Sequence, residues 1–370
     1  MKKFKLSNHQ LSLICAFLAT VGLTISTTTL AQRKPLPAPP LPVPVPPPQL
    51  NSPVPSFPNV PNFPNQNGGW QRVKLLHLLK AHWGPIYALT FSPDGKILAS
   101  GGTDIDTKIR LWNPLKGKRI RTIKAHSNRV LSLAITPDNL TMASGSEDAT
   151  VNIWSLKNGE LSRRLTHDFS NILSLAITPD GQTLVSGGLD GIRLIDLRTE
   201  RLLYTRVPLS QPITYALAIS PDGQTLATGG RDKSIQLWNL TTSQFLGAIP
   251  GHEGAISSLA FTPDGSKLIS SSYDHTIKVW DLVRRRSYTL FGHDNIVNAI
   301  AVNPDGQTLA SAGRDGLKLW NLATGQLIGS IPLDTDWVQT VAFSPDGKLL
   351  ASGAYDGTLK IWEVENDFRF

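Results

Sequence analysis

The chain has 370 residues, of which 40% are hydrophobic and 17% charged, with one cysteine and a formal net charge of +8. A single cysteine excludes a disulfide-stapled scaffold and a cysteine-ligated zinc or iron–sulfur site, and 30 glycines with 27 prolines argue against a coiled coil. A basic chain raises nucleic acid or an anionic surface as a partner, so the charge must be located along the chain.

The first 31 residues have the pattern of an export signal. Three lysines lie within the first five residues, an apolar stretch runs from Leu11 to Ile25, and small residues stand at Thr29 and Ala31. Because a signal peptidase recognises small residues at this spacing, we expect cleavage before Gln32 and an exported, periplasmic or extracellular protein. An uncleaved membrane anchor is the alternative, since about 20 residues can span a bilayer.

Residues 32–69 form a proline-rich linker, with 14 prolines between Pro35 and Pro64. Proline removes the backbone donor and fixes φ, so we expect polyproline II rather than a sheet or helix. At about 3.1 Å per residue the linker would reach on the order of 90 Å. A stalk that holds a domain away from a membrane and a solvated leader without a role are both open interpretations.

From about residue 70 to residue 370 one pattern recurs seven times. Each repeat has a Pro-Asp-Gly turn or a close variant between two alternating apolar runs, and successive turns are 41 to 44 residues apart. Proline presets φ, aspartate bonds its own backbone and glycine accepts a positive φ, so each is a hairpin turn. Asn139 replaces the glycine in the second repeat, and asparagine also adopts the left-handed conformation. The turn aspartates are Asp94, Asp138, Asp180, Asp222, Asp264, Asp305 and Asp346.

Each repeat continues with a second turn that carries an aspartate, and then with a strand that carries a tryptophan, or Ile195 in the third repeat. Five repeats also have a histidine after a small residue or threonine. Four short strands per repeat, seven times over, predict an all-β fold: a seven-bladed β-propeller of four-stranded antiparallel blades.

These residues resemble the marks of the WD-repeat family from about residue 72 to 365. Trp280-Asp281 reproduces the Trp-Asp pair, and Gly251-His252 the Gly-His pair. Only eight residues follow Trp362, so the seventh blade lacks its outer strand. Residues 71–80 have the pattern of that strand, and we expect this N-terminal segment to close the ring, because open sheet edges need protection.

Repeated histidine, serine and aspartate invite a catalytic or metal-binding interpretation. The resemblance instead implies a structural network in which one His, one Ser or Thr, one Asp and one Trp tie each blade together. No catalytic or phosphate-binding motif occurs, so we expect no enzyme, no metal and no cofactor. The network is complete in repeats one, two, five and six, with His82, Ser100, Asp106, Trp112, His126, Ser144, Asp148, Trp154, His252, Ser270, Asp274, Trp280, His293, Ser311, Asp315 and Trp320.

Three repeats depart from this set. The third keeps His167, Ser186 and Asp190 but has Ile195 in place of tryptophan. The fourth and seventh have no histidine and show Leu-Ser (209–210) and Leu-Asp (333–334) instead. We expect the fourth and seventh blades to be less rigid and to be the place for a functional departure.

The resemblance implies that partners dock on the face that bears the histidine-preceded and aspartate-bearing loops. Interface hot spots favour Trp, Tyr and Arg, because such side chains bury much area at low entropic cost. For any one residue, stacking on a neighbouring loop or an ion pair is the alternative. The expected partner-binding residues are Trp83, Arg129, Phe169, Arg231, Tyr273, Arg314, Trp337 and Tyr355.

Most of the net charge precedes residue 73, which leaves +2 on the propeller, divided into +6 for residues 73–206 and −4 for residues 207–370. We therefore do not expect nucleic acid as a partner. The favoured function is a monomeric, exported, non-enzymatic protein-interaction scaffold. An envelope protein that binds carbohydrate or another small ligand is the alternative, and a propeller enzyme is a third.

Overall fold

β-strands make up all the regular secondary structure that the computed structural model describes, and they form seven four-stranded sheets. All described residues belong to one unit of the chain, Ser56–Phe370. No helix in the described part of the chain could cross a membrane. The predicted signal segment (1–31) and linker (32–69) lie outside the described residues, which are 70, 72–103, 105–165, 170–199, 201–206, 213–331 and 337–364.

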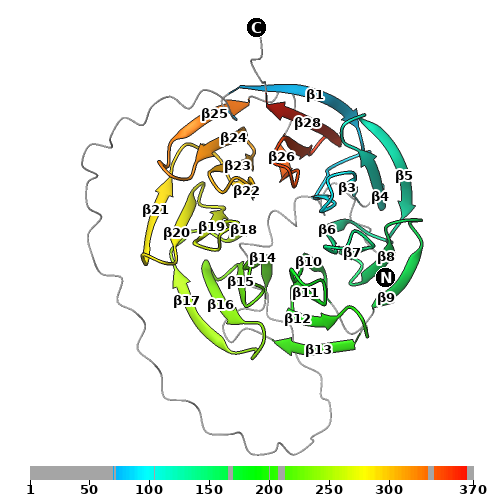
Figure 1. The fold of residues 1–370 in the computed structure, drawn as a ribbon, viewed down its shortest axis with the longest axis horizontal. Coiled ribbons are helices and arrows are strands. Elements are labelled where there is room, and N and C mark those ends of the chain that lie inside the picture. Colours follow the sequence, from blue (N-terminus) through cyan, green and yellow to red (C-terminus); the bar gives the residue numbers. More distant parts are fainter. Residues whose placement is uncertain are drawn as a thin grey trace, which may run out of the picture. The chain divides into compact units, whose positions relative to one another are not determined.

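Each sheet is one blade, and the blades follow one another around a ring in chain order (Figure 1). The innermost strands are β2 (Ala88–Phe91), β6 (Val130–Ile135), β10 (Ile172–Ile177), β14 (Thr214–Ile219), β18 (Ile256–Phe261), β22 (Val297–Val302) and β26 (Val338–Phe343). The second strands are β3 (Leu98–Gly101), β7 (Thr141–Ser146), β11 (Thr183–Gly188), β15 (Thr225–Gly230), β19 (Lys267–Ser272), β23 (Thr308–Gly313) and β27 (Leu349–Ala354).

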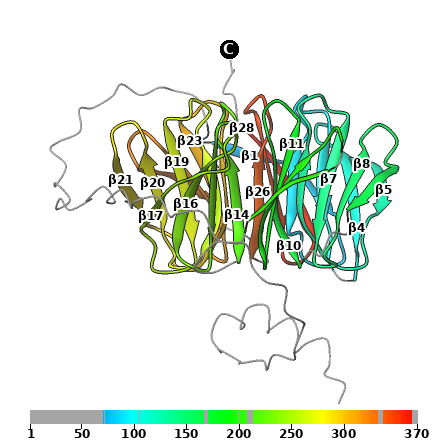
Figure 2. The same cartoon turned by 90° about the horizontal axis from the view of Figure 1, so that it is seen from below.

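The third and fourth strands complete the blades, with every pairing antiparallel. The third strands are β4 (Lys108–Asn113), β8 (Val151–Ser155), β12 (Gly191–Asp196), β16 (Ser234–Asn239), β20 (Ile277–Asp281), β24 (Gly316–Asn321) and β28 (Thr358–Val364). The outermost strands are β5 (Lys118–Lys124), β9 (Leu161–Leu165), β13 (Arg201–Arg206), β17 (Phe245–Pro250), β21 (Arg286–Leu290), β25 (Leu327–Ile331) and β1 (Val73–Lys80). The edge-on view of the blades in Figure 2 shows their strands running between two faces that consist of loops. The predicted seven-bladed fold is confirmed.

The Pro-Asp-Gly turns connect the innermost strand of each blade to the second strand. In the first blade the Ser92 hydroxyl donates to Asp94 Oδ1 at 2.7 Å, and the Lys96 amide donates to the same oxygen at 3.1 Å. Gly95 has φ 71° and Asn139, at the equivalent position of the second blade, has φ 61°. The turn chemistry therefore matches the prediction, including the asparagine that replaces glycine.

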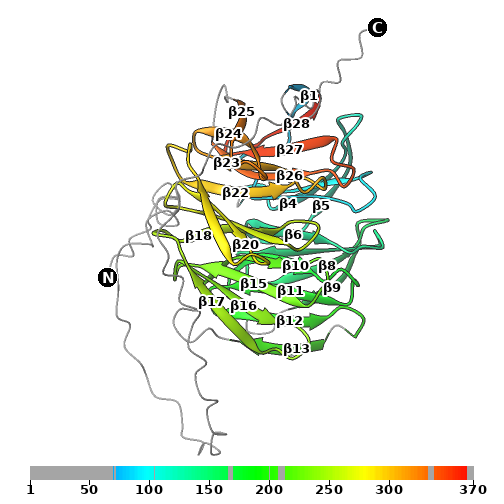
Figure 3. The ribbon, with the colours of Figure 1, turned by 60° about the vertical axis from the view of Figure 1, so that its left-hand side comes forward.

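The first strand of the chain closes the ring. β1 pairs with β28 from Val73 opposite Val364 to Lys80 opposite Thr358, so it is the outer strand of the seventh blade (Figure 3). Just before it, Trp70 is buried and packs edge-to-face on Phe343 of β26, with ring centroids 4.9 Å apart. The predicted closure is confirmed, with the strand beginning at Val73.

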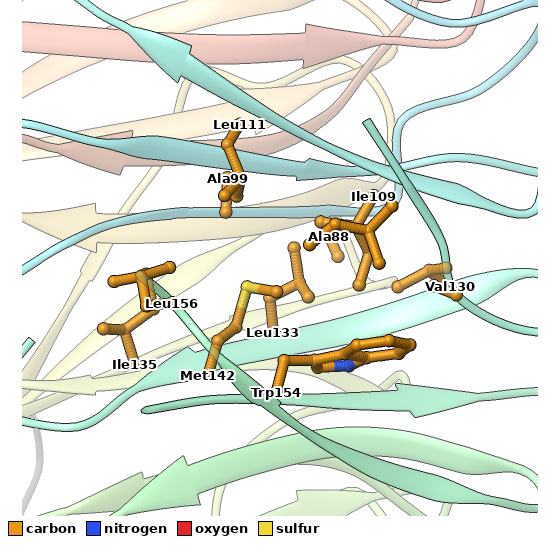
Figure 4. Close-up of a cluster of buried hydrophobic side chains, with 12 residues drawn as sticks. Ala88, Ala99, Ile109, Leu111, Val130, Leu133, Ile135, Met142, Trp154 and Leu156 are labelled. Atoms are coloured by element: carbon orange, nitrogen blue, oxygen red, sulfur yellow. The ribbon is translucent and has the colours of Figure 1, made fainter. Parts of the chain in front are cut away.

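The hydrophobic core consists of seven clusters, and each spans two neighbouring blades. Between the first two blades, Leu111 of β4 and Ala88 of β2 face Val130, Met142 and Trp154 of the second blade (Figure 4). The tryptophan of each third strand therefore packs toward the preceding blade. Because burial is shared between blades, the ring as a whole is the unit that buries apolar surface.

Candidate functional site

The predicted His-Ser-Asp-Trp residues meet within single blades. In the fifth blade His252 Nδ1 lies 2.9 Å from the Asp274 carboxylate, and His252 Nε2 lies 2.8 Å from Ser270 Oγ. Trp280 Nε1 donates to the same hydroxyl at 2.9 Å. A neutral histidine satisfies this geometry when its Nδ1–H donates to the carboxylate and its Nε2 accepts the serine proton. The hydroxyl thereby links the histidine of the loop to the tryptophan of the third strand.

The same three contacts recur in the first, second and sixth blades. The His–Ser distances are 2.7 to 2.8 Å, the Trp–Ser distances 2.8 to 2.9 Å and the His–Asp distances 2.6 to 3.3 Å. The structure thus brings together all sixteen residues predicted for the four complete networks.

The charge states of the network in the sixth blade follow from burial and from its hydrogen bonds. Burial alone would raise the pKa of Asp315, but hydrogen bonds from Lys318 and His293 outweigh it and hold that pKa at about 2. Burial lowers the pKa of His293 despite the neighbouring carboxylate. A charged aspartate therefore faces a neutral histidine, and both ring nitrogens of His293 have partners within the blade.

The first blade uses a different arrangement around its histidine. Arg110 Nη1 lies 2.7 Å from His82 Nδ1 and 2.5 Å from Asp106 Oδ2. Because arginine can only donate, His82 Nδ1 accepts here and Nε2–H donates to Ser100 Oγ, the opposite tautomer from that in the fifth blade. Burial, followed by the charge of Arg110, lowers the pKa of His82 to about 4, so this histidine is neutral at physiological pH.

In two of the incomplete blades a side chain of the third strand binds the aspartate of the second turn. In the fourth blade Gln236 Nε2 donates to Asp232 at 2.8 Å, and Trp238 donates to Thr228 at 3.1 Å. In the third blade the guanidinium of Arg193 binds the Asp190 carboxylate at 2.9 Å. The positions at 166–167, 209–210 and 333–334 lie outside the described residues, so the lower rigidity of the fourth and seventh blades stays a prediction.

The third-strand partners were missed in the sequence, although a signal was present. Every repeat has a polar side chain two residues before its tryptophan or Ile195. Asn152 at this position is fully buried and donates to the backbone oxygen of Ala125 at 2.8 Å. A polar residue repeated inside a buried strand indicates a partner, because a buried polar group without one costs free energy. The seven residues are Arg110, Asn152, Arg193, Gln236, Lys278, Lys318 and Lys360.

The predicted partner-binding residues within the described ranges lie in two kinds of loop, either before an innermost strand or between a second and a third strand. They do not form one cluster. Trp83 is 82% exposed in the loop between β1 and β2, and Arg231 lies between β15 and β16. Among the described residues neither has an ion pair or a ring contact. Arg129 contacts Glu147, with Nε and Oε2 3.4 Å apart, as the ion-pair alternative anticipated. Phe169 lies outside the described residues.

A cation–aromatic cluster unites three of the predicted residues from the sixth and seventh blades. The Arg314 guanidinium lies 3.8 Å from the centre of the Trp337 ring, and this ring lies 5.4 Å from that of Tyr355. The Tyr355 amide also donates to the Trp337 carbonyl at 2.9 Å, which joins the two loops. On the fifth blade Tyr273 stacks on Tyr215 at 6.4 Å, and sequence reasoning missed Tyr215 because it belongs to an inner strand rather than a turn.

A groove of about 320 Å³ lies elsewhere, at the junction of the third and fourth blades. Its lining includes the Pro-Asp-Gly turns of both blades, with Asp180 and Asp222, and the apolar side chains of Leu194, Leu203 and Leu240. No group of three or more His, Cys, Asp or Glu side chains within the described ranges could hold a metal ion.

Together, the ring of seven blades and the repeated serine-centred network define a β-propeller of the WD type. Two family models match the chain. The one described as "IFT122 first beta-propeller" matches residues 104–288, half of the chain, and the one described as "WD domain, G-beta repeat" matches residues 73–113, 284–321 and 325–363. The chain therefore belongs to the WD-repeat β-propeller family, whose members are generally protein-interaction scaffolds. No curated protein matches it.

Proposed function

We propose that this protein is a non-enzymatic interaction scaffold that binds other proteins through the face bearing the Arg314–Trp337–Tyr355 cluster. The single observation that carries the proposal is this partly exposed stack, in which Arg314 lies 3.8 Å from the Trp337 ring. Membership of the WD-repeat family supports the same function. The rigid blades would hold the loops while the loops supply the contacts.

The cluster has the properties of an interface hot spot. Trp337 is 37% exposed, so part of its ring faces solvent while the guanidinium and Tyr355 hold its orientation. Stacking fixes the rotamers in advance, and less entropy is then lost on binding. Arg314 in addition keeps hydrogen-bond donors for a partner, because a guanidinium that stacks through its face can still donate at its edge.

We further propose that the propeller is exported and presented outside the cytoplasmic membrane. The basic start, the apolar stretch Leu11–Ile25 and the small residues at Thr29 and Ala31 support this location. The only cysteine, Cys15, lies inside the proposed signal, so the mature chain would be insensitive to an oxidising compartment. N-terminal sequencing of the cell-derived protein tests the proposal: Gln32 as first residue is expected, and an intact Met1 in the cytoplasmic fraction would contradict it.

The role of the face bearing the Arg314–Trp337–Tyr355 cluster is tested with the purified protein, which is used to capture polypeptides from an envelope extract. The bound polypeptides are then identified. Replacing Arg231, Arg314 and Trp337 together with alanine should abolish capture of the polypeptides that the wild type retains. The matched control replaces Arg198, Val283 and Arg285, exposed residues of the turns before the outer strands, and should capture normally. Undiminished capture by the face variant would move the site elsewhere, and retention on cell-wall polysaccharide without any captured polypeptide would favour the carbohydrate-binding alternative.

A further inference from the structure

The outer walls of the first two blades carry many exposed cations, which we call the basic rim. Between Thr107 and Pro137 the chain has eight basic residues and no acidic one. Arg121 links the two blades by donating to the backbone oxygens of Lys157 and Asn158, and β5 and β9 are neighbours in the outer ring (Figure 1). The basic rim consists of Lys116, Lys118, Arg119, Arg121, Lys124, Lys157, Arg163 and Arg164, all of them exposed.

Few acids balance these charges. Within the described ranges no carboxylate pairs with Lys116, Lys118, Arg119, Lys124 or Lys157. Glu160, the acid within this stretch of the second blade, accepts a hydrogen bond from Asn158 Nδ2 at 2.6 Å. The surplus of positive charge therefore faces solvent, where it can attract an anionic surface.

Protection of strand edges does not account for the basic rim. Lysine on an outer strand can prevent edge-to-edge pairing, so the same device would be expected in every blade. The outer segments of the fourth and sixth blades, residues 240–251 and 322–331, contain no charged residue at all. Pro250 ends the outer strand of the fourth blade, and Gly247 and Gly329 interrupt the two apolar edges. This protein therefore has outer edges without charges, and the cations of the first two blades need another explanation.

Apolar side chains stand among the cations of the basic rim. Leu115 is 69% exposed in the turn before β5, and Ile120 is 50% exposed within it. A soluble polyanion gains nothing from these side chains. A bilayer surface takes up both kinds of group, because lysine and arginine attract anionic headgroups while leucine and isoleucine enter the interface.

We propose that the basic rim is a docking surface for a bilayer that contains anionic lipid. The chain outside the structure fits this occupant, since the apolar stretch Leu11–Ile25 and the linker of residues 32–69 precede the propeller. In the alternative in which this stretch stays as an anchor, a linker with a reach on the order of 90 Å would keep the propeller near that membrane and raise the effective concentration of the contact. After the proposed cleavage before Gln32, the rim itself would supply the contact with the bilayer. Docking through the rim leaves the loop face with Arg314 and Trp337 free for partners, so this proposal goes beyond the scaffold function.

Sedimentation of the full chain with lipid vesicles tests the proposal. Wild-type protein should bind vesicles of phosphatidylcholine with phosphatidylglycerol more tightly than vesicles of phosphatidylcholine alone, and salt should weaken the difference. Because the segments before the propeller carry cations of their own, among them Lys2, Lys3 and Lys5, the contribution of the rim is measured by comparing the rim variant with the control variant, which share these segments. The variant Lys118→Gln, Arg119→Gln, Lys124→Gln should lose this preference, by about five-fold for each charge removed.

The matched control removes three exposed cations elsewhere, with Lys233→Gln, Arg285→Gln and Lys348→Gln, and should keep the preference of the wild type. Equal loss in both variants, or no loss in the rim variant, would overturn the proposal. A second pair, Leu115→Ser with Ile120→Ser, should weaken vesicle binding. If that pair binds vesicles as the wild type does, and soluble polyphosphate competes fully, the bilayer is the wrong occupant.

The lipid-docking proposal and the scaffold proposal can be tested independently of each other. The alanine variant at Arg231, Arg314 and Trp337 should bind anionic vesicles as the wild type does, since none of these residues belongs to the rim. Loss of vesicle binding in that variant would place the lipid contact on the loop face and overturn the assignment to the rim.

Discussion

In each complete network a single serine hydroxyl connects the histidine to the tryptophan. Ser270 Oγ receives the Trp280 N–H at 2.9 Å and lies 2.8 Å from His252 Nε2, with all three side chains buried. In the third blade the equivalent Ser186 is also buried, but its hydroxyl has no hydrogen-bond partner among the described residues. Ile195 stands where tryptophan would donate, and His167 lies outside the described residues. The two serines therefore form a natural comparison.

Ser270→Ala should lower the free energy of unfolding by about 2–4 kcal/mol, because it leaves a buried indole N–H and an imidazole nitrogen without a partner. Ser186→Ala should change it by less than about 1 kcal/mol, since no described bond is lost. Urea unfolding of both variants at neutral pH measures the difference. Equal destabilisation at the two sites would show that the network contributes nothing beyond packing.

His82 should make the folded protein less stable as the pH drops below about 6.5. Its folded pKa is about 4 and its ordinary value is 6.5, so between these pH values the unfolded chain binds a proton that the folded chain does not. The contribution is fully present above about pH 6.5 and lost as the pH falls to about 4, with a limit of about 3 kcal/mol. Urea unfolding at pH 7 and pH 4.5 should show a smaller difference for His82→Gln than for the wild type. The same pH dependence in both proteins would contradict the assignment to His82.

At the scale of elements, one strand and one side chain before it close the ring. β1 covers the edge of β28 along its length, and Trp70 packs against Phe343 on the inner strand of the same blade. Without this segment the seventh blade would expose the edge of β28 and part of the core between the sixth and seventh blades. The closure contacts join positions almost 300 residues apart in the chain, which makes them costly to form but effective once formed.

Trp70→Ala should lower the free energy of unfolding by about 3–5 kcal/mol, the usual cost of removing a buried tryptophan. Trp83→Ala is the matched control, because this ring is 82% exposed, and it should change stability by less than about 0.5 kcal/mol. Deletion of residues 70–81 should lower the melting temperature by more than either substitution. An unchanged melt after the deletion would contradict closure by β1.

At the scale of the whole molecule, side chains of outer strands tie some neighbouring blades together. His77 Nε2 lies 2.9 Å from the Leu115 oxygen at the junction of the seventh and first blades, and the Tyr288 hydroxyl donates to the Leu322 oxygen between the fifth and sixth. At the equivalent positions of the fourth and sixth blades stand Gly247 and Gly329, which cannot make such a contact. Hydrogen bonds from this position of the outer strand therefore join some neighbouring blades and not others.

Tyr288→Phe should lower the free energy of unfolding by about 1 kcal/mol, the usual value of one hydrogen bond. Burial raises the pKa of Tyr288 to about 12, so the hydroxyl remains a donor at neutral pH. Tyr204→Phe, at the equivalent position of the third blade, should be neutral, because its side chain is 39% exposed and water can satisfy the hydroxyl. Chemical unfolding measures both, and an equal loss at Tyr204 would contradict the role of the inter-blade bond.

Much of this architecture was predictable because its determinants are local. Asp94 and its equivalents mark turns whose geometry depends on three adjacent residues, and the distance between successive turns sets the blade length. The residues of each complete network recur at fixed spacings within one repeat, and the resemblance to the WD-repeat family implied that Ser270 and its partners form a network. Arg110 and the other third-strand partners escaped notice, because charged and amide side chains are ordinarily expected at the surface.

The number of blades, the turns and the strand that closes the ring could be inferred from the sequence, since each depends on residues close together in one repeat or on a count of strands, whereas the networks were implied by the resemblance to the WD-repeat family. Only the tertiary structure decided that Arg314 stacks on Trp337, that Trp70 covers Phe343, and that the cations of β5 lie beside those of the second blade. These pairs lie in different repeats. Their distances are set by the packing of neighbouring blades and, for Trp70, by the closure of the ring, and no local spacing in the chain encodes them.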